Sequence, residues 1–181
     1  TSGVVRIKAP QITGATLFLV ANIDEDMLNV SSERLNTIQS ISELESMNVH
    51  LIQQTTSRNG YFPMVAKLSG VAVTQTEINT GGETAYLERL DSKVTVNVKL
   101  ADNSELKAFI PEVCKIKNLP LGSRVVNSAA SDFEEAGYFD SQVTFDEQIT
   151  NAEGDIRETT CSFYMLENRE SGNLKNSVTA Y

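Results

Sequence analysis

Apolar and polar residues alternate in several short stretches of the chain, and this alternation predicts β-strands. It is clearest over residues 94–100, where Val94, Val96 and Val98 alternate with polar neighbours. We expect that segment to be a strand with one face buried. Further strands are predicted at residues 4–9, 67–73, 84–90, 106–110, 114–116, 143–145 and 161–165. Eight to ten short strands at this spacing are typical of a mainly β fold of β-sandwich type.

One stretch is apolar almost without interruption. Residues 15–21 read Ala-Thr-Leu-Phe-Leu-Val-Ala. A strand covered on both faces has this composition, so we expect residues 15–21 to lie centrally in a sheet.

A helical period interrupts the strands between residues 31 and 47. Leu35, Ile38, Ile41, Leu44 and Met47 recur at steps of three and form one apolar stripe on a helix. Ser31 or Ser32 is a candidate N-cap, and Ser40 with Glu43 has the spacing of a capping box. The segment is therefore one helix or two short helices that meet near residue 40, with the stripe as packing surface.

Turn signals separate the predicted strands. Asn59-Gly60 and Gly81-Gly82 favour tight turns, and residues 151–154 favour another. Residues 118–122 are expected to form a turn or loop, and the small and acidic residues 127–137 a solvated loop.

The net charge and the distribution of basic residues exclude some classes of binding partner. The chain has 181 residues and a net charge of -9, with its 15 Lys and Arg residues scattered along it. Binding to phosphate backbones or anionic membranes needs clustered basic residues, so neither nucleic acid nor a membrane surface is an expected partner. No stretch approaches the roughly 20 apolar residues of a transmembrane helix.

Residues for catalysis or metal binding do not form a recognisable motif. His50 is the only histidine, no nucleophile motif lies near it, and a surface or loop position is the expected one. Asp24-Glu25-Asp26 lacks the alternating acidic positions of an EF-hand loop. We therefore predict no enzyme, no catalytic residue, no cofactor and no metal, although a carboxylate pair for glycoside hydrolysis stays open among the 24 acidic residues. Asn29-Val30-Ser31 has the spelling of a glycosylation sequon.

The two cysteines, Cys114 and Cys161, each lie in a run with a period of two, which places them among core-facing side chains. Two buried free thiols are expected, and a bridge between them stays open.

Four segments, in this order, resemble the fimbrillin family of Bacteroidales cell-surface pilus subunits. They are Thr16–Asn22, Pro63-Met64 followed by Leu68-Ser69-Gly70, Leu87–Val94, and Ser162–Arg169. In that family an apolar strand ending in Val-Ala-Asn precedes a helix, and an aromatic Phe-Tyr strand ending in Glu-Asn comes later. The family's usual Ala-Lys pair is replaced here by Ser92-Lys93.

The resemblance implies tandem β-sandwich domains. Residues 1–90 would be most of an N-terminal domain that is transthyretin-like with a short helical insertion, and residues 91–181 an incomplete second sandwich. The family's processed segment would precede residue 1, so Arg6 is not expected to be the cleavage site.

The resemblance also implies a function: a structural or adhesive subunit of a fimbrium, made as an outer-membrane lipoprotein. After proteolytic processing it would polymerise on the cell surface by strand addition between subunits. Its partners would be other fimbrial subunits and ligands on host or bacterial surfaces, and contact with the membrane would be through a lipid anchor on the precursor. The alternative is a surface glycan-binding β-sandwich protein or an accessory domain of a glycan-degrading system.

Overall fold

The structure is a computed structural model that describes residues 10–23, 25–58, 60, 62–74, 78–79, 84–102, 104–109, 111–126, 137–168 and 177–180. This described part is mainly β, as the alternating pattern predicts, with twelve strands and two short helices. The elements are β1 (Ile12–Ala21), α1 (Ser32–Asn36), α2 (Ile41–Ser46), β2 (Asn48–His50), β3 (Met64–Val73), β4 (Ile78–Asn79), β5 (Glu88–Arg89), β6 (Asp91–Lys99), β7 (Val113–Pro120), β8 (Gly122–Arg124), β9 (Tyr138–Thr144), β10 (Glu147–Thr150), β11 (Ile156–Leu166) and β12 (Ser177–Ala180).

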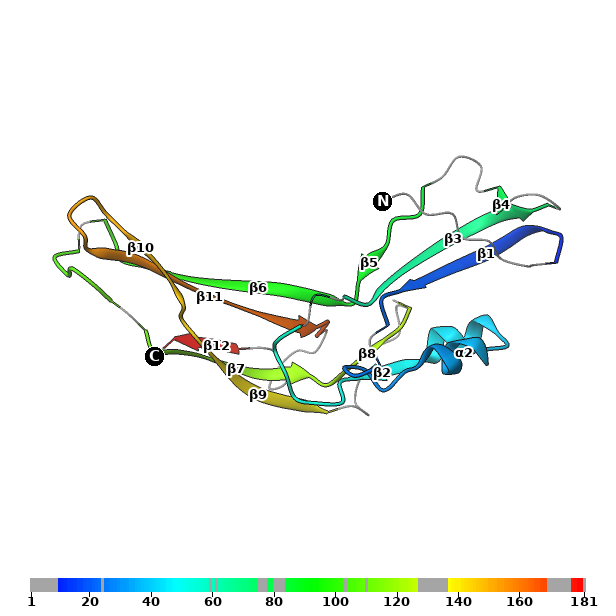
Figure 1. The fold of residues 1–181 in the computed structure, drawn as a ribbon, viewed down its shortest axis with the longest axis horizontal. Coiled ribbons are helices and arrows are strands. Elements are labelled where there is room, and N and C mark those ends of the chain that lie inside the picture. The colour runs from blue at the N-terminus through cyan, green and yellow to red at the C-terminus, as the bar shows by residue number, and fades with distance from the viewer. Residues whose placement is uncertain are drawn as a thin grey trace.

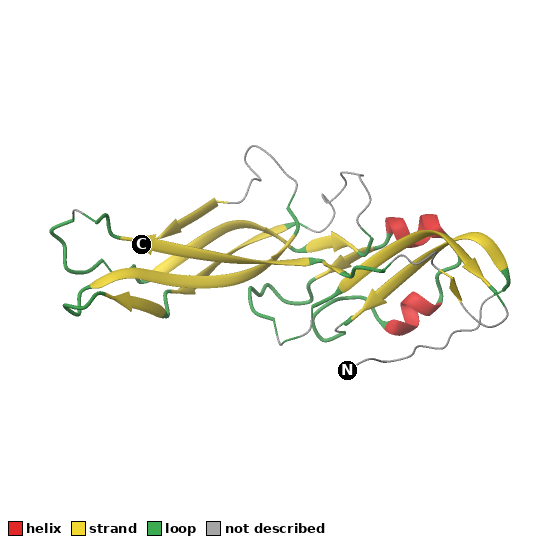
Figure 2. Ribbon diagram, turned by 90° about the horizontal axis from the view of Figure 1, so that it is seen from above, coloured by secondary structure: helices red, strands yellow, loops and turns green. Residues whose placement is uncertain are grey.

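The strands form four antiparallel sheets, two at each end of an elongated molecule (Figure 1). At one end, β1, β3, β4 and β5 form a sheet that lies over the helices and over the β2–β8 pair. At the other end, a sheet of order β10-β11-β6 faces a sheet of order β12-β7-β9. Seen from above, the long strands run close to the long axis of the molecule (Figure 2).

A connected hydrophobic core extends through both ends. Phe163 and Leu166 of β11 pack in it with Ile116 and Leu119 of β7, and Val49 of β2 belongs to the same cluster. All five side chains are buried. Packing between facing sheets therefore holds the two ends together, as burial of apolar surface is the main favourable term in folding.

The strand predicted most clearly is confirmed as β6. Val94, Val96 and Val98 are half-buried, while Thr95 and Asn97 between them are exposed. The alternation in the sequence matches the alternation in burial, because one face of β6 lies on the core and the other faces solvent.

The helical stripe forms two helices that are separated near residue 40. Ser31 caps α1 by accepting a hydrogen bond from the Arg34 N–H, and Ser40 caps α2 by accepting one from the Glu43 N–H. The carboxylate of Glu43 reaches back to the N–H of Gln39, one residue earlier than in the usual capping box. Two good caps within ten residues explain why the stripe does not form one helix.

The prediction of a central strand at residues 15–21 is wrong for the described part of the chain. There β1 pairs with β3 alone, and none of its side chains is fully buried. The apolar run does not distinguish a strand covered on both faces from an edge strand with partly uncovered apolar faces.

Strand boundaries near residue 120 also differ from the prediction. β7 continues through the predicted turn to Pro120, and β8 follows after Leu121. A bulge explains this: Asn118 has a positive φ of 58°, and the pairing of β7 with β9 shifts between Ile116 and Leu119. The chain therefore bends without leaving the sheet.

Two predicted strands are absent or shorter. Residues 104–109 contain no strand, and Leu106 and Phe109 are exposed. Of residues 84–90, only Glu88 and Arg89 are in a strand. The count of eight to ten strands is too low, because the short strands β2, β8, β10 and β12 carry too few residues to show a period.

The turn at residues 151–154 is confirmed. The Asn151 side chain accepts hydrogen bonds from the N–H groups of Glu153 and Asp155, and Gly154 adopts a φ of 84° that favours glycine. The predictions for residues 4–9, for Asn59, for Gly81-Gly82 and for 127–136 lie outside the described residues.

Candidate assembly surface

The most unusual surface of the described structure is the edge strand β1. None of its ten residues is charged, and within the described part of the chain its only hydrogen-bonded neighbour is β3. An edge strand exposes unpaired N–H and C=O groups, and an uncharged apolar edge offers another strand a template for pairing.

The longer edge strands of the other sheets carry charged residues, whereas the uncharged edge strands β2, β4 and β12 have only three, two and four residues. The edge strand β6 contains Asp91, Lys93 and Lys99, and the edge strands β9 and β10 contain Asp140 and Glu147. Charged side chains on an edge discourage pairing with another chain. β1 therefore differs from β6, β9 and β10 in chemistry and from β2, β4 and β12 in length.

A glycine-associated bulge protects part of β1. Gly14 has a φ of 75°, and the register against β3 shifts on both sides of Ala15. From Leu17 to Ala21 the register is regular. The stretch best suited to accept a strand is therefore Leu17–Ala21.

The two faces of this stretch are both apolar. Phe18 and Val20 pack against the core, and the ammonium of Lys67 lies 5.3 Å from the Phe18 ring centroid. On the opposite face, Leu19 is 38% exposed beside Ala66 of β3. A strand added at this edge would extend apolar surface on both faces.

A second open edge lies on the other side of β3. β3 pairs with β5 at Met64 and Val65 and with β4 at Ala72 and Val73, and the described residues show no strand partner for 66–71 on that side. A cavity of about 310 Å³ lies beside it. Its walls are Val65, Ala66, Lys67, Leu68, Thr84, Tyr86, Glu88 and Val126.

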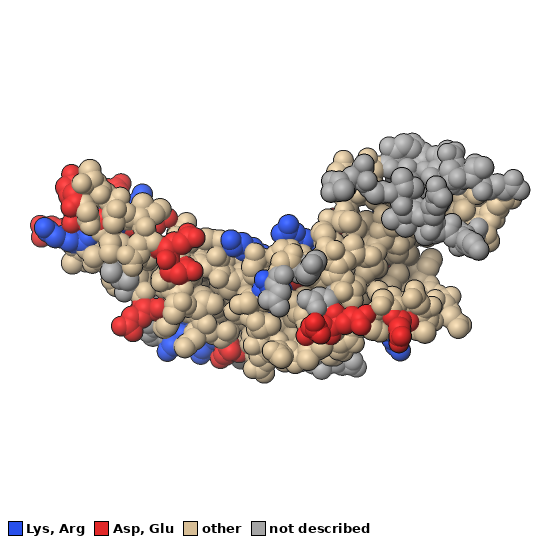
Figure 3. Space-filling view, viewed as in Figure 1, with Lys and Arg blue, Asp and Glu red and all other residues tan. Residues whose placement is uncertain are grey.

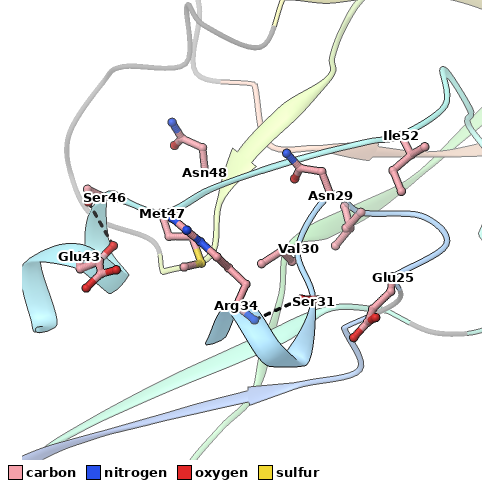
Figure 4. Close-up of a pocket in the computed structure, with 11 residues that line it drawn as sticks. Glu25, Asn29, Val30, Ser31, Arg34, Glu43, Ser46, Met47, Asn48 and Ile52 are labelled. Atoms are coloured by element: carbon pink, nitrogen blue, oxygen red, sulfur yellow. Dashed lines mark hydrogen bonds between the residues drawn. The ribbon is translucent and has the colours of Figure 1, made fainter. Parts of the chain in front are cut away.

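A separate groove of about 740 Å³ lies between the helices and the loop before α1 (Figure 4). Its polar lining includes Asn29, Arg34, Glu43 and Asn48, which come from different segments. The side-chain oxygen of Asn48 is buried and has no hydrogen-bond partner among the described residues. This groove has hydrogen-bonding groups suited to a hydroxyl-rich ligand.

Several residues singled out in the sequence lie beside this groove in structural roles. His50 lies half-buried in β2, where its N–H donates to the Asn29 side-chain oxygen at 2.7 Å. Within the sequon, Val30 is buried and Ser31 caps α1. Asp24 lies outside the described residues. No group of three or more metal-binding side chains occurs in the described ranges.

Glu25 acts as an extension of the α1 cap. Its carboxylate accepts hydrogen bonds from the N–H of Ser32 at 2.8 Å and from the Ser32 hydroxyl at 3.0 Å. These two bonds, the backbone one first, hold the pKa of Glu25 below its usual value. Glu25 of the acidic tripeptide thus contributes to a helix start.

A buried ion pair was missed by sequence reasoning. Arg58 donates to both carboxylate oxygens of Asp91, at 3.1 and 2.6 Å, and both side chains are fully shielded from solvent. Arg58 also donates to the carbonyl oxygens of Thr55 and Ser57. It thereby fixes the loop before β3 to the start of β6.

Aromatic contacts reinforce this junction. The Phe62 and Tyr164 rings lie 5.1 Å apart, and the Arg89 guanidinium lies 4.6 Å from the Phe62 ring centroid. The Tyr164 N–H donates to the Thr56 carbonyl oxygen. Sequence reasoning did not find these contacts, because those of Tyr164 join residues about 100 positions apart in the chain.

Surface charge is mixed over the face seen in Figure 3, where basic side chains lie among acidic ones. Across the part of the chain that the structure describes, no helix has the length and apolarity to cross a membrane. No protein-family model matches the sequence, and no curated protein matches it.

Proposed function

We propose that this protein is a structural or adhesive subunit of a bacterial cell-surface fimbrium that polymerises by strand addition after proteolytic processing. The observation that carries the proposal is the uncharged edge strand β1, with one strand partner among the described residues. Strand addition uses main-chain hydrogen bonds for affinity and alternate side chains for specificity. The resemblance to fimbrillins also implies assembly by strand addition.

The proposal includes the finer architecture. Residues 1–90 would belong to a transthyretin-like sandwich and residues 91–181 to a second sandwich. In that division β8 of the second domain pairs with β2 of the first, and the hydrophobic core contains residues of both. The precursor would be an outer-membrane lipoprotein, and the protein would bind other chains without transforming a substrate.

The energetic scale is sufficient for a lasting assembly. Each fully buried apolar side chain contributes about 1.5 to 3 kcal/mol, and several would offset the cost of association, estimated at about 4 to 15 kcal/mol. Side chains at Leu17–Ala21 supply half-buried apolar surface on one partner.

The test compares two matched lysine substitutions. Leu19→Lys places a charge on the edge strand β1, and Ile149→Lys places one at an exposed apolar site on β10. Purified chains, with and without treatment by a protease specific for Lys and Arg, are examined by analytical ultracentrifugation and negative-stain microscopy.

We expect wild type and Ile149→Lys to form fibres and Leu19→Lys to stay monomeric with an unchanged thermal midpoint. Absence of fibres from every chain, or equal assembly of Leu19→Lys, would contradict the proposal.

The groove in Figure 4 favours a second candidate function, binding of surface glycans. The guanidinium of Arg34 and the amides of Asn29 and Asn48 are donors of the kind that bind sugar hydroxyls. A glycan array read with wild type and with Arg34→Ala tests this. Binding that is lost in Arg34→Ala supports a glycan-binding role, and no binding by wild type rejects it.

A further inference from the structure

The two cysteines lie on the central strands of two facing sheets. Cys114 is in β7, between β12 and β9, and Cys161 is in β11, between β10 and β6. Both are free thiols with exposed fractions of 0% and 1%. They belong to the same hydrophobic cluster.

Their side chains lie in the core between these two sheets. Each thiol also shifts the pKa of the other, as neighbouring groups do. Some Cα atoms of β7 and β11 approach within 8 Å, closer than the roughly 10 Å at which packed sheets usually lie. A disulfide requires the two Cα atoms to lie about 4.4 to 6.8 Å apart, and strands that approach this closely are compatible with a bridge between them.

We propose that Cys114 and Cys161 form a disulfide that joins the two sheets when the chain folds in the presence of a small-molecule disulfide or a thiol–disulfide oxidoreductase. The bond closes a loop of about 50 residues that contains β8, β9 and β10. It stabilises the end of the molecule that carries β6, β7, β9 and β11.

The reaction is two successive thiol–disulfide exchanges. A cysteine thiolate attacks the disulfide of the oxidant, forms a mixed disulfide and releases one thiolate. The second cysteine, after losing its proton, attacks the cysteine sulfur of the mixed disulfide and releases the second thiolate. The two protein thiols lose two protons and two electrons, and the oxidant is reduced to two thiols.

Burial determines when this exchange takes place. Desolvation raises the pKa of Cys114 above its ordinary value and raises the pKa of Cys161 to about 12, where the neighbouring Cys114 adds to the effect. Thiolate is therefore scarce in the folded chain, and both sulfurs are shielded from a reagent. The bond forms during folding, while the thiols are still accessible.

The experiment refolds the wild-type chain from denaturant in a mixture of oxidised and reduced glutathione. We expect the intact mass to fall by the mass of two hydrogens and maleimide labelling under denaturing conditions to find no free thiol. The oxidised chain should melt about 5 to 15 °C above the reduced one. The reduced chain, treated with the same mixture without denaturant, should convert at least tenfold more slowly.

The single variants Cys114→Ala and Cys161→Ala are controls and should show no loss of two hydrogens and no oxidant-dependent rise in melting temperature. The wild-type chain alone decides the matter even if a variant folds poorly. Two free thiols after refolding, glutathione bound to both cysteines, disulfide-linked dimers, or a bridged chain that melts no higher than the reduced chain would each overturn the proposal.

Discussion

At the residue scale, two fully charged side chains, Arg58 and Asp91, lie completely out of contact with water. They tolerate burial because the guanidinium donates to both carboxylate oxygens and to two backbone carbonyls. Removing one partner of such a pair leaves an uncompensated charge in the interior. We therefore expect that, among the polar contacts of the described structure, this junction between the loop before β3 and the start of β6 loses most stability on substitution.

We predict that Asp91→Ala lowers the free energy of unfolding by about 3 to 5 kcal/mol. The matched control is Glu45→Ala, which removes the partly exposed pair that Glu45 makes with Lys67 and should cost under about 1 kcal/mol. Urea unfolding followed by circular dichroism measures both. Equal losses of unfolding free energy in the two variants would show that the buried pair stabilises the protein no more than the exposed pair does.

Glu25 provides a pH-dependent prediction at the same scale. Its pKa lies below the ordinary 4.5 because of the Ser32 N–H and hydroxyl. A carboxyl whose pKa is lowered on folding stabilises the native state above its unfolded pKa, and this contribution disappears as the pH falls through the folded value. The window in which the start of α1 weakens is therefore below pH 4.5.

The variant Ser32→Pro removes both donors at the first position of α1, where proline fits a helix. Ser31 before it already has the extended backbone that a following proline requires. We predict that an NMR titration finds the Glu25 pKa returned toward its ordinary value in Ser32→Pro and moved only part of the way in Ser32→Ala. An unchanged Glu25 titration in Ser32→Pro would disprove the assignment.

At the element scale, local signals determine helices and turns, and the sequence predicts these well. Ser31, Ser40 and the 151–154 turn act on neighbours within four residues. Strand pairing acts over longer distances: β2 and β8 carry three residues each and are some 70 residues apart, so no local pattern predicts them. The position of β1 at an edge was missed for the same reason, because an apolar run does not show how many neighbours a strand has.

The N-cap of α2 gives a prediction at this scale. Ser40→Ala removes the side-chain acceptor for the Glu43 N–H and should cost about 1 kcal/mol of unfolding free energy. Ser42→Ala, two residues further on in the same helix at an exposed position, should change stability by less than about 0.5 kcal/mol. Chemical denaturation of both variants measures the difference, and a Ser42 effect as large as the Ser40 effect would contradict it.

At the scale of the whole molecule, a shared core and the Arg58–Asp91 pair join two sets of sheets into an elongated body (Figure 1). The mainly β class follows from the sequence pattern, whereas the candidate assembly surface does not, because edge position is a property of the assembled sheet. The groove beside the helices is lined by residues from several segments, and the sequence alone does not indicate that these residues lie together. An elongated body with an uncharged edge strand is compatible with the strand addition that we propose.

The most direct test of this account is amide hydrogen exchange of the β1 segment, measured in fibres and in monomers by mass spectrometry. Strand addition predicts that exchange of residues 17–21 slows at least tenfold in the fibre, because open N–H groups gain partners, while exchange of the charged edge strand β6 stays unchanged. Equal exchange of residues 17–21 in monomer and fibre, or protection confined to β6, would contradict assembly through β1.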